Sequence, residues 1–171
     1  MIVTETPRLI LRYFTPDDLD ALTPILADSE VMRYSISGVK TRSQTEEFIT
    51  RLLSIYQKYN FGLYAVIYKE TQQLIGYCGL LAWNFEDLEE IEIGYRLATA
   101  YWGKGLATEA ATSVRNYAWN ELNINRLICI IEPENTRSIR VAEKLGMTYE
   151  KDAVFYGLNV RIYSTAILNH L

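Results

Sequence analysis

The chain has 171 residues, of which 49% are apolar and 22% are charged, and it carries a net charge of −4. This composition is typical of a globular protein that is long enough to bury a substantial core, and it excludes a disordered chain. Nucleic-acid binding normally needs a basic stripe. The sequence has no run of lysines and arginines, so we exclude that class of partner.

The two cysteines and the N-terminal segment indicate the cellular setting. Cys78 and Cys129 lie in apolar stretches, without a CxxC partner or a nearby histidine, which favours a reduced chain over a disulfide scaffold. Residues 1–14 lack the pattern of a signal peptide, and no apolar run approaches the roughly 18 residues that span a bilayer. We therefore expect a soluble, cytoplasmic protein with no metal and no membrane partner.

The first half of the chain reads as helices between short strands. Residues 9–13 predict a strand, and Thr15-Pro16 starts a predicted helix over 17–26, with Thr15 as the N-cap. Helical spacing of apolar residues predicts a second helix over 43–59. Strands are expected over 62–68, 74–81 and 90–97. Their short connections predict antiparallel neighbours.

The second half alternates helices and strands. An apolar stripe predicts a helix over 104–120, and the strand over 126–131 returns after it, so this strand should lie parallel to 90–97. Asn135 caps a predicted short helix that stops at Gly146. Residues 149–155 and 159–168 predict a final hairpin. The order β-α-α-β-β-β-α-β-α-β-β predicts a mixed sheet covered by helices.

The most informative segment, residues 90–112, reads EIEIGYRLATAYWGKGLATEAAT. A strand is followed by Gly103-Lys104-Gly105, which opens directly into a helix. Glycines let a ligand approach the backbone, and the free N–H groups of the first helical turn point at it. The alternative is a turn that serves close packing, and the GxxxxGK[ST] pattern of a P-loop is absent. With Glu90 and Glu92 upstream, the segment predicts a group-transfer enzyme whose donor carries phosphates.

The element order, the segment 102–110 (WGKGLATEA) and the segment 135–147 (NTRSIRVAEKLGM) resemble the GNAT superfamily of acetyl-CoA-dependent N-acetyltransferases. The segments 6–12 and 92–97 are similar to its RimJ/RimL branch, which includes acetyltransferases of ribosomal-protein N-termini. The resemblance covers nearly the whole chain. It implies one N-acetyltransferase domain over 1–171 with the α/β (α+β) GNAT fold: a mixed, mostly antiparallel sheet of about six to seven strands, with a central parallel pair splayed by a β-bulge and about four flanking helices.

The resemblance also implies an activity. Acetyl-CoA would be the co-substrate, without a metal, and a primary amine would attack the thioester directly, without a covalent enzyme intermediate. The expected acceptor is the α-amine of a protein N-terminus, such as that of a ribosomal protein. A small amine (a polyamine, an amino acid or an antibiotic) is the alternative within enzymes, and a non-catalytic acyl-CoA sensor is the alternative outside them. Both a monomer and a homodimer are compatible with the sequence.

The resemblance further implies a set of binding residues around the glycine turn. Asn135 would contact the pantetheine arm as well as cap its helix. For Ser138, contact with the cofactor and exposure to solvent are both open. The expected cofactor-binding residues are Tyr95, Leu97, Gly103, Lys104, Gly105, Leu106, Ala107, Thr108, Asn135 and Ser138.

The sequence departs from the family pattern at two positions. Ala100 stands where the superfamily usually has Gln or Arg, although the backbone cradle does not need that side chain. Ala142 stands where many members have a tyrosine that acts as general acid. The leaving thiolate must then be protonated by Ser138, by a water or by another tyrosine. The expected catalytic residues are Glu92, Ser138 and Tyr95.

Glu90 and Glu92 lie two residues apart on one strand, so they face the same side. We expect Glu92, next to Gly94, to be the general base and Glu90 to be part of an exposed polar face. An α-amine, with a pKa of about 7.7–8.0, needs only a modestly basic carboxylate, whereas a lysine amine near 10.4 demands more. Gly94 is either a bulge that frees an N–H near Tyr95 to polarise the thioester carbonyl, or a glycine tolerated for packing.

The acidic run at 86–92 is either a solvated hairpin or a funnel for a cationic amine or basic peptide. Four aromatic or turn elements are candidates for the wall of an acceptor pocket beside Glu92. These are Tyr34, Trp83, Phe85 and the turn Tyr156–Asn159.

Overall fold

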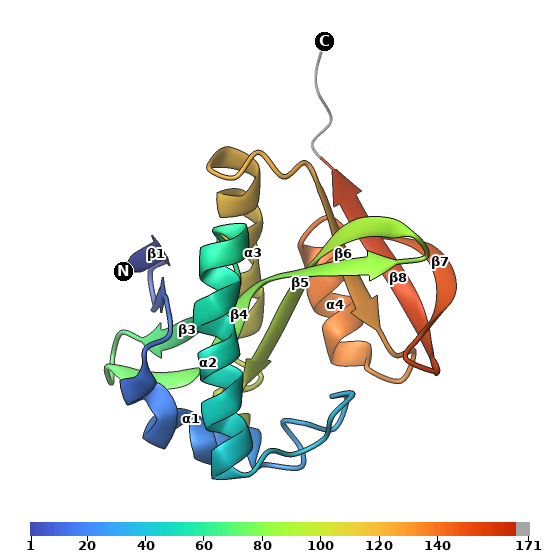
Figure 1. Cartoon of the computed structure of the whole chain (residues 1–171). Helices are drawn as coiled ribbons and strands as arrows, with labels where there is room; N and C mark the ends of the chain where they lie inside the picture. The colour runs from blue at the N-terminus through green and yellow to red at the C-terminus, as the bar shows by residue number, and fades with distance from the viewer. Residues whose placement is uncertain (167–171) are drawn as a thin grey trace.

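The structure, a computed structural model, describes residues 1–166, which form eight strands and four α-helices (Figure 1). In chain order these are β1 (Ile2–Glu5), β2 (Leu9–Arg12), a 3-10 turn (Pro16–Asp18), α1 (Leu19–Leu26), α2 (Arg42–Tyr59), β3 (Leu63–Tyr68), β4 (Gln73–Phe85), β5 (Leu88–Leu97), a second 3-10 turn (Thr99–Tyr101), α3 (Leu106–Asn120), β6 (Arg126–Ile131), α4 (Thr136–Lys144), β7 (Thr148–Phe155) and β8 (Leu158–Ala166). The strands form one sheet in the order β1-β2-β3-β4-β5-β6-β8-β7.

The sequence-based elements agree with the structure except at their ends and at the first strand. Strand β1, which pairs antiparallel with β2, was not expected. The strands β4 and β5 extend towards each other into a long hairpin that turns at Glu86-Asp87, two residues with φ of 50° and 61°. Two-residue type I′ hairpin turns require this left-handed conformation at both positions, and aspartate is one of the residues that tolerate it. Of the last predicted strand, positions 167 and 168 lie outside the described residues.

Helix α3 begins two residues later than expected because Gly105, with φ of 75°, is its N-cap. The helix predicted from residue 17 begins as a 3-10 turn, after which α1 starts at Leu19. The Asp18 carboxylate accepts a hydrogen bond from the Thr15 backbone N–H at 2.8 Å, and it forms an ion pair with Arg12. Within residues 1–166, no helix is long and apolar enough to cross a membrane.

The helices cover both faces of the sheet, and Figure 1 shows α2 in front of β4 and α3 behind it. Side chains of β5 alternate between the two faces. Arg96 reaches Val31 in the segment between α1 and α2, whereas Tyr95 reaches Ser138 in α4. We name the two sides the α1–α2 face and the α3–α4 face. Glu92 shares the α1–α2 face with Arg96, since the two residues are four apart on one strand.

The parallel pair β5–β6 makes only one register contact, between Glu92 and Ile128. Beyond Glu92 the two strands separate. The antiparallel register of β5 with β4 continues through Gly94 without a shift, so the expected bulge is not found in this ladder. A Cβ at Gly94 would lie 3.1 Å from Leu81 Cδ1. Close packing against β4 therefore accounts for this glycine, which is the alternative that the sequence left open.

Candidate active site

The glycine turn that we expect to cradle an anion lies at the start of α3. Gly103 and Gly105 have φ of 71° and 75°, and no atom lies within 4 Å of a Cβ placed on Gly103. The first hydrogen bond of the helix runs from Glu109 N to Gly105 O at 3.0 Å. The backbone N–H groups of residues 106–108 therefore have no partner inside the helix. They point out of its N-terminus, where the helix dipole is positive. Open space beside Gly103 and the free amides of the first helical turn fit a phosphate-bearing ligand.

Arg8 holds this cradle in place, which the sequence did not reveal. Its guanidinium donates to Lys104 O at 2.9 Å and forms an ion pair with Glu109 at 2.7 Å. The Glu109 carboxylate also accepts from Thr6 Oγ1 at 2.6 Å and from the Arg8 backbone N–H at 3.0 Å. The segment before β2 is thereby fastened to the first turn of α3. These contacts join residues about a hundred positions apart, so no local signal could have identified them.

The loop before the cradle is tied to β5 and α4. Trp102 Nε1 donates to Leu97 O at 2.7 Å, and the guanidinium of Arg137 lies 4.7 Å from the centre of the Trp102 ring. Lys104 is exposed, with its ammonium 5.5 Å from the Tyr101 ring centre, and it has no ion-pair partner within residues 1–166. Its charge is available at the mouth of the cradle.

The structure brings Tyr95 and Ser138 together. Asn135 caps α4 by accepting from the Ser138 backbone N–H at 3.3 Å, and this places Ser138 one turn into the helix. Tyr95 Oη donates to Ser138 Oγ at 3.0 Å. Burial raises the pKa of the Tyr95 hydroxyl above its usual value, against the opposing effect of the Ser138 hydrogen bond. Tyr95 is therefore a protonated donor at neutral pH, on the face that also carries α3 and α4.

Glu92 lies on the opposite face, at the position where β5 leaves β6. Its carboxylate is partly buried and accepts a hydrogen bond from Trp83 Nε1 at 2.7 Å. Burial raises the pKa of Glu92 to about 7, while the hydrogen bonds from Trp83 and the Ile130 backbone and the charge of Arg96 act to lower it. A carboxylate with this pKa is half ionised near neutral pH, which suits a general base.

Glu90 has a different role from the one expected. It is only 8% exposed and forms an ion pair with Arg126 at 2.8 Å, instead of belonging to an exposed polar face. Arg126 also pairs with Glu150 of β7 at 3.0 Å. The partner of Glu90, Arg126, lies on β6 and is 36 positions away in the sequence. Only the arrangement of strands in the sheet brings the two residues together. Glu90 fastens β5 to the β6–β8–β7 half of the sheet.

Cys129 lies on β6 beside the gap between β5 and β6. Its thiol donates to Ile93 O at 3.6 Å, and burial raises its pKa well above the usual value. The thiol is therefore protonated and a poor nucleophile. This geometry is consistent with chemistry that uses no cysteinyl intermediate.

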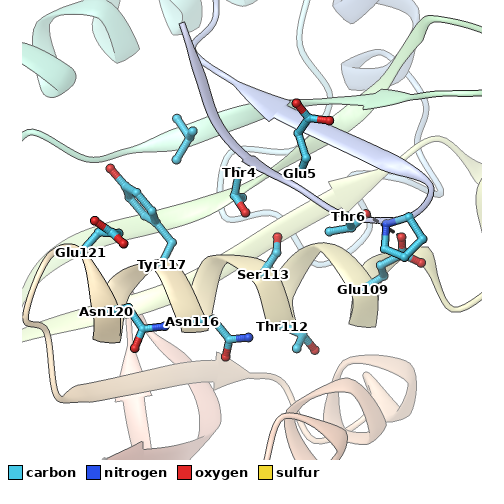
Figure 2. Close-up of a pocket in the computed structure, with 12 residues that line it drawn as sticks. Thr4, Glu5, Thr6, Glu109, Thr112, Ser113, Asn116, Tyr117, Asn120 and Glu121 are labelled. Atoms are coloured by element: carbon cyan, nitrogen blue, oxygen red, sulfur yellow. Dashed lines mark hydrogen bonds between the residues drawn. The ribbon is translucent and has the colours of Figure 1, made fainter.

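Two of the surface cavities within residues 1–166 differ in their relation to the site. The larger of the two, of about 650 Å³, lies between α3 and residues 3–7, and none of the predicted site residues lines it (Figure 2). The smaller, of about 340 Å³, is lined by Tyr59, Ala82, Trp83, Asn84, Asp87 and Glu89. Glu92 is not among its lining residues, but the Trp83 side chain that lines it donates a hydrogen bond to Glu92.

The expected acceptor wall is only partly assembled. The Trp83 ring lies 5.1 Å from Phe155 and 6.1 Å from Tyr156, so the β7–β8 turn does border this region. Phe85 is buried in a core cluster with Phe155. Tyr34 does not line the cavity beside Trp83. Within residues 1–166, no group of three His, Cys, Asp or Glu side chains is placed to hold a metal ion.

Comparison with known proteins identifies the family. The model of the acetyltransferase (GNAT) domain matches residues 8–148. The chain belongs to the GNAT acetyltransferase family. It is 34% identical over 165 residues to the uncharacterized protein YkkB of Bacillus subtilis, covering 96% of this chain and 95% of YkkB. It is 36% identical over 148 residues to the uncharacterized N-acetyltransferase p20 of Bacillus licheniformis, covering 85% and 82% of the two chains.

A solved GNAT structure has the same fold. The GNAT-family acetyltransferase from Bacillus anthracis superposes with a TM-score of 0.81 at 30% identity, over 98% of both chains. GNAT acetyltransferases take their acetyl group from acetyl-CoA. The glycine turn of this chain fits that co-substrate. The space beside Gly103 is open, so a phosphate group of acetyl-CoA could lie there against the backbone.

Proposed function

We propose that this chain is a single-domain, cytoplasmic N-acetyltransferase that acetylates a primary α-amine, with a protein N-terminus as the acceptor. The observation that carries the proposal is Glu92, a partly buried carboxylate with a pKa of about 7 at the point where β5 leaves β6. Such a base matches an α-amine, with a pKa of about 7.7–8.0, better than a lysine amine. The resemblance of segments 6–12 and 92–97 to the RimJ/RimL branch supports the same acceptor class.

The roles of the co-substrate site follow from its backbone. The amides of Gly103, Lys104, Gly105, Leu106, Ala107 and Thr108 would hold the pyrophosphate, with Lys104 adding charge at the mouth. Beyond Glu92, the edge of β5 that faces β6 has no strand partner. The backbone of Tyr95 and Leu97 would pair there with the amides of the pantetheine arm, and Asn135 and Ser138 would contact the arm from α4.

In this proposal, the proton leaves the amine on one face of the sheet and is supplied to the leaving sulfur on the other face. The amine nitrogen would approach on the α1–α2 face and form a bond to the acetyl carbon, while Glu92 accepts its proton directly or through a water. The carbon–sulfur bond breaks on the α3–α4 face, where Tyr95 would donate its proton to the leaving sulfur. Ser138 orients that hydroxyl at 3.0 Å. In this proposal Glu92 would be the base and Tyr95 the acid, without the tyrosine that many members of the family have at the position of Ala142.

A second candidate acceptor is a small cationic amine. The cavity beside Glu92 has two carboxylates, Asp87 and Glu89, and two aromatic rings, Tyr59 and Trp83. Carboxylates and aromatic faces both attract cations. A polyamine would fit this chemistry as well as a peptide N-terminus does.

Release of the CoA thiol tests both candidates. Under saturating acetyl-CoA, peptides with free α-amines should be acetylated faster than spermidine or an aminoglycoside, and kcat/KM should fall as pH drops below about 7, where Glu92 gains its proton. Glu92→Gln should lower kcat by about 10²–10⁴ near neutral pH, with partial recovery above about pH 8, where the amine deprotonates unaided. Preference for a small amine would reject the peptide acceptor, whereas acetyl-CoA binding without turnover of any amine would reject the enzyme and support a sensor.

A further inference from the structure

The Glu92 carboxylate receives a side-chain hydrogen bond from the neighbouring strand β4. Trp83 stands opposite Glu90 in the β4–β5 ladder, whereas Glu92 stands opposite Leu81. Trp83 and Glu92 are therefore diagonal neighbours on one face of the sheet, and an aromatic side chain is long enough to span that separation. The structure shows the contact, in which Trp83 Nε1 donates to Glu92 Oε2 at 2.7 Å.

The Trp83 indole is itself held in place from the other half of the sheet. The centre of its ring lies 5.1 Å from that of Phe155 in β7, at an interplanar angle of 83°, and 6.1 Å from that of Tyr156 in the following turn. Phe155 is buried in the core cluster of that half, and Trp83 packs against this cluster. A tryptophan side chain has only two torsion angles, so packing of its ring also fixes the direction of its N–H group.

A fixed donor matters for a glutamate because the last torsion of this side chain is poorly defined. Torsions that end in a carboxylate have broad minima, so packing of the aliphatic part alone leaves the carboxylate of Glu92 free to turn. A hydrogen bond to one of its oxygens from a clamped indole removes this freedom. Trp83 therefore sets the orientation of the carboxylate from β4 and β7, two strands that do not carry it.

We propose that Trp83 is a positioning residue, which holds the Glu92 carboxylate in the orientation that accepts the proton of the acceptor amine. This inference rests on the proposed function. A base must lie within hydrogen-bond reach of the proton that it takes, and small displacements of a reacting group cost large factors in rate. The same hydrogen bond favours the ionised form of Glu92, which is the form that acts as base. The effect of Trp83 on turnover therefore passes through Glu92.

The other ionisable groups around Glu92 are not expected to titrate near neutral pH. Arg96, on the same strand, contributes a positive charge. Tyr77 on β4 and Cys129 on β6 stay neutral, because burial raises the pKa of both side chains. Glu90 faces the same side but is engaged in an ion pair of its own. A change in the pH profile that follows loss of the indole donor can therefore be assigned to Glu92.

Trp83→Phe removes the donor and keeps an aromatic ring against Phe155. Loss of a hydrogen bond to the ionised form should raise the pKa of Glu92, so the acid limb of kcat/KM should move up by about one pH unit, and kcat/KM at pH 7 should fall about tenfold. Trp119→Phe is the matched control, because Trp119 Nε1 has no hydrogen-bond partner within residues 1–166. It should keep both the rate and the limb. An acid limb that stays in place in Trp83→Phe would overturn the positioning role.

A double-mutant cycle tests whether Trp83 acts through Glu92. In the Glu92→Gln background the side chain that Trp83 orients can no longer take a proton, so adding Trp83→Phe should lower the residual rate at pH 7 by less than about twofold. An equal loss in both backgrounds would mean that Trp83 acts independently of Glu92, and it would reject the proposal.

Nuclear magnetic resonance of the indole N–H groups needs neither turnover nor a Trp83 variant. The chain has three tryptophans, and Trp102→Phe and Trp119→Phe assign two of the three indole signals. The remaining signal, from Trp83, should shift with pH with a midpoint of about 7, and Glu92→Gln should remove this shift. If no amine releases thiol, the proposed function fails, while this titration still decides whether Trp83 binds Glu92. An indole signal that does not move with pH would reject the contact.

Discussion

At the scale of single residues, Glu92 ties the candidate chemistry to the stability of the fold. Its pKa in the folded protein is about 7, above the value of 4.5 for a free carboxyl. The folded state therefore holds a proton that the unfolded chain loses between pH 4.5 and 7. The free-energy cost of burying the ionised Glu92 carboxylate is absent below the unfolded pKa of 4.5 and complete above the folded pKa of about 7. The stability of the fold therefore declines as pH rises from 4.5 to 7.

Glu92→Gln should consequently stabilise the protein at pH 8 by up to about 3 kcal/mol and leave it unchanged at pH 4. The glutamine oxygen can still accept from Trp83 Nε1, so packing is preserved. Urea unfolding at the two pH values measures the difference. A variant that is no more stable at pH 8 than the wild type would show that the ionised carboxylate carries no penalty.

Glu90→Gln serves as the matched comparison, because it removes a carboxylate that is paired with Arg126. It should lower stability at pH 8, the opposite sign to Glu92→Gln, while leaving the pH dependence of turnover in place. If Glu90→Gln instead abolishes turnover in a folded protein, the roles of the two glutamates are reversed.

Tyr95→Phe tests the proposed acid. It should lower kcat by about 10²-fold at pH 7 with little change in KM for acetyl-CoA. The defect should shrink above about pH 8.5, where a thiolate leaves without a proton. Tyr68→Phe is the control, since the Tyr68 hydroxyl contacts Glu70 at 2.7 Å, away from the site. A defect that is equal at all pH values would mean that Tyr95 only positions Ser138.

At the scale of elements, the sequence was informative wherever the signal is local. Periodicity and caps predicted four helical segments, and the glycine pair predicted a turn that opens into α3. The short strand β1 was not predicted, because its four residues show no clear alternation of apolar and polar side chains. The partners of Glu90, Glu92 and Glu109 were not predicted either. Each is fixed by sheet register or by packing across the fold, which sequence spacing does not encode.

The cradle itself depends on a contact between distant elements. Arg8 fastens the segment before β2 to α3 through Lys104 O and Glu109. Arg8→Ala should loosen the first turn of α3 and weaken acetyl-CoA binding by about tenfold in calorimetry, with the far-ultraviolet spectrum unchanged. Arg42→Ala removes an exposed ion pair with Asp20 on the other face and should leave the affinity unaltered. Equal losses in both variants would reject a specific role for Arg8.

At the scale of the whole molecule, the sheet consists of two halves joined at one weak seam. The β1–β5 half and the β6–β8–β7 half meet at the single parallel register contact of Glu92 with Ile128, supported by the Glu90–Arg126 ion pair. The candidate base Glu92 and the candidate acid Tyr95 both lie on β5 at this seam, on opposite faces of the sheet. A co-substrate that enters it would replace the missing strand pairing and couple the two halves.

Acetyl-CoA should therefore stabilise the protein as a unit. At a concentration a hundred times its Kd, a ligand that binds only the folded state adds about 2.7 kcal/mol, which for a chain of this size raises Tm by roughly 5–10 °C. Hydrogen exchange should slow most at the β5 amides after Glu92 that face the gap. Gly105→Asp, which sets a negative charge in the cradle, should abolish both effects, whereas Glu92→Gln should retain them because it acts on the acceptor side. Stabilisation by acetyl-CoA that persists in Gly105→Asp would place the phosphates elsewhere.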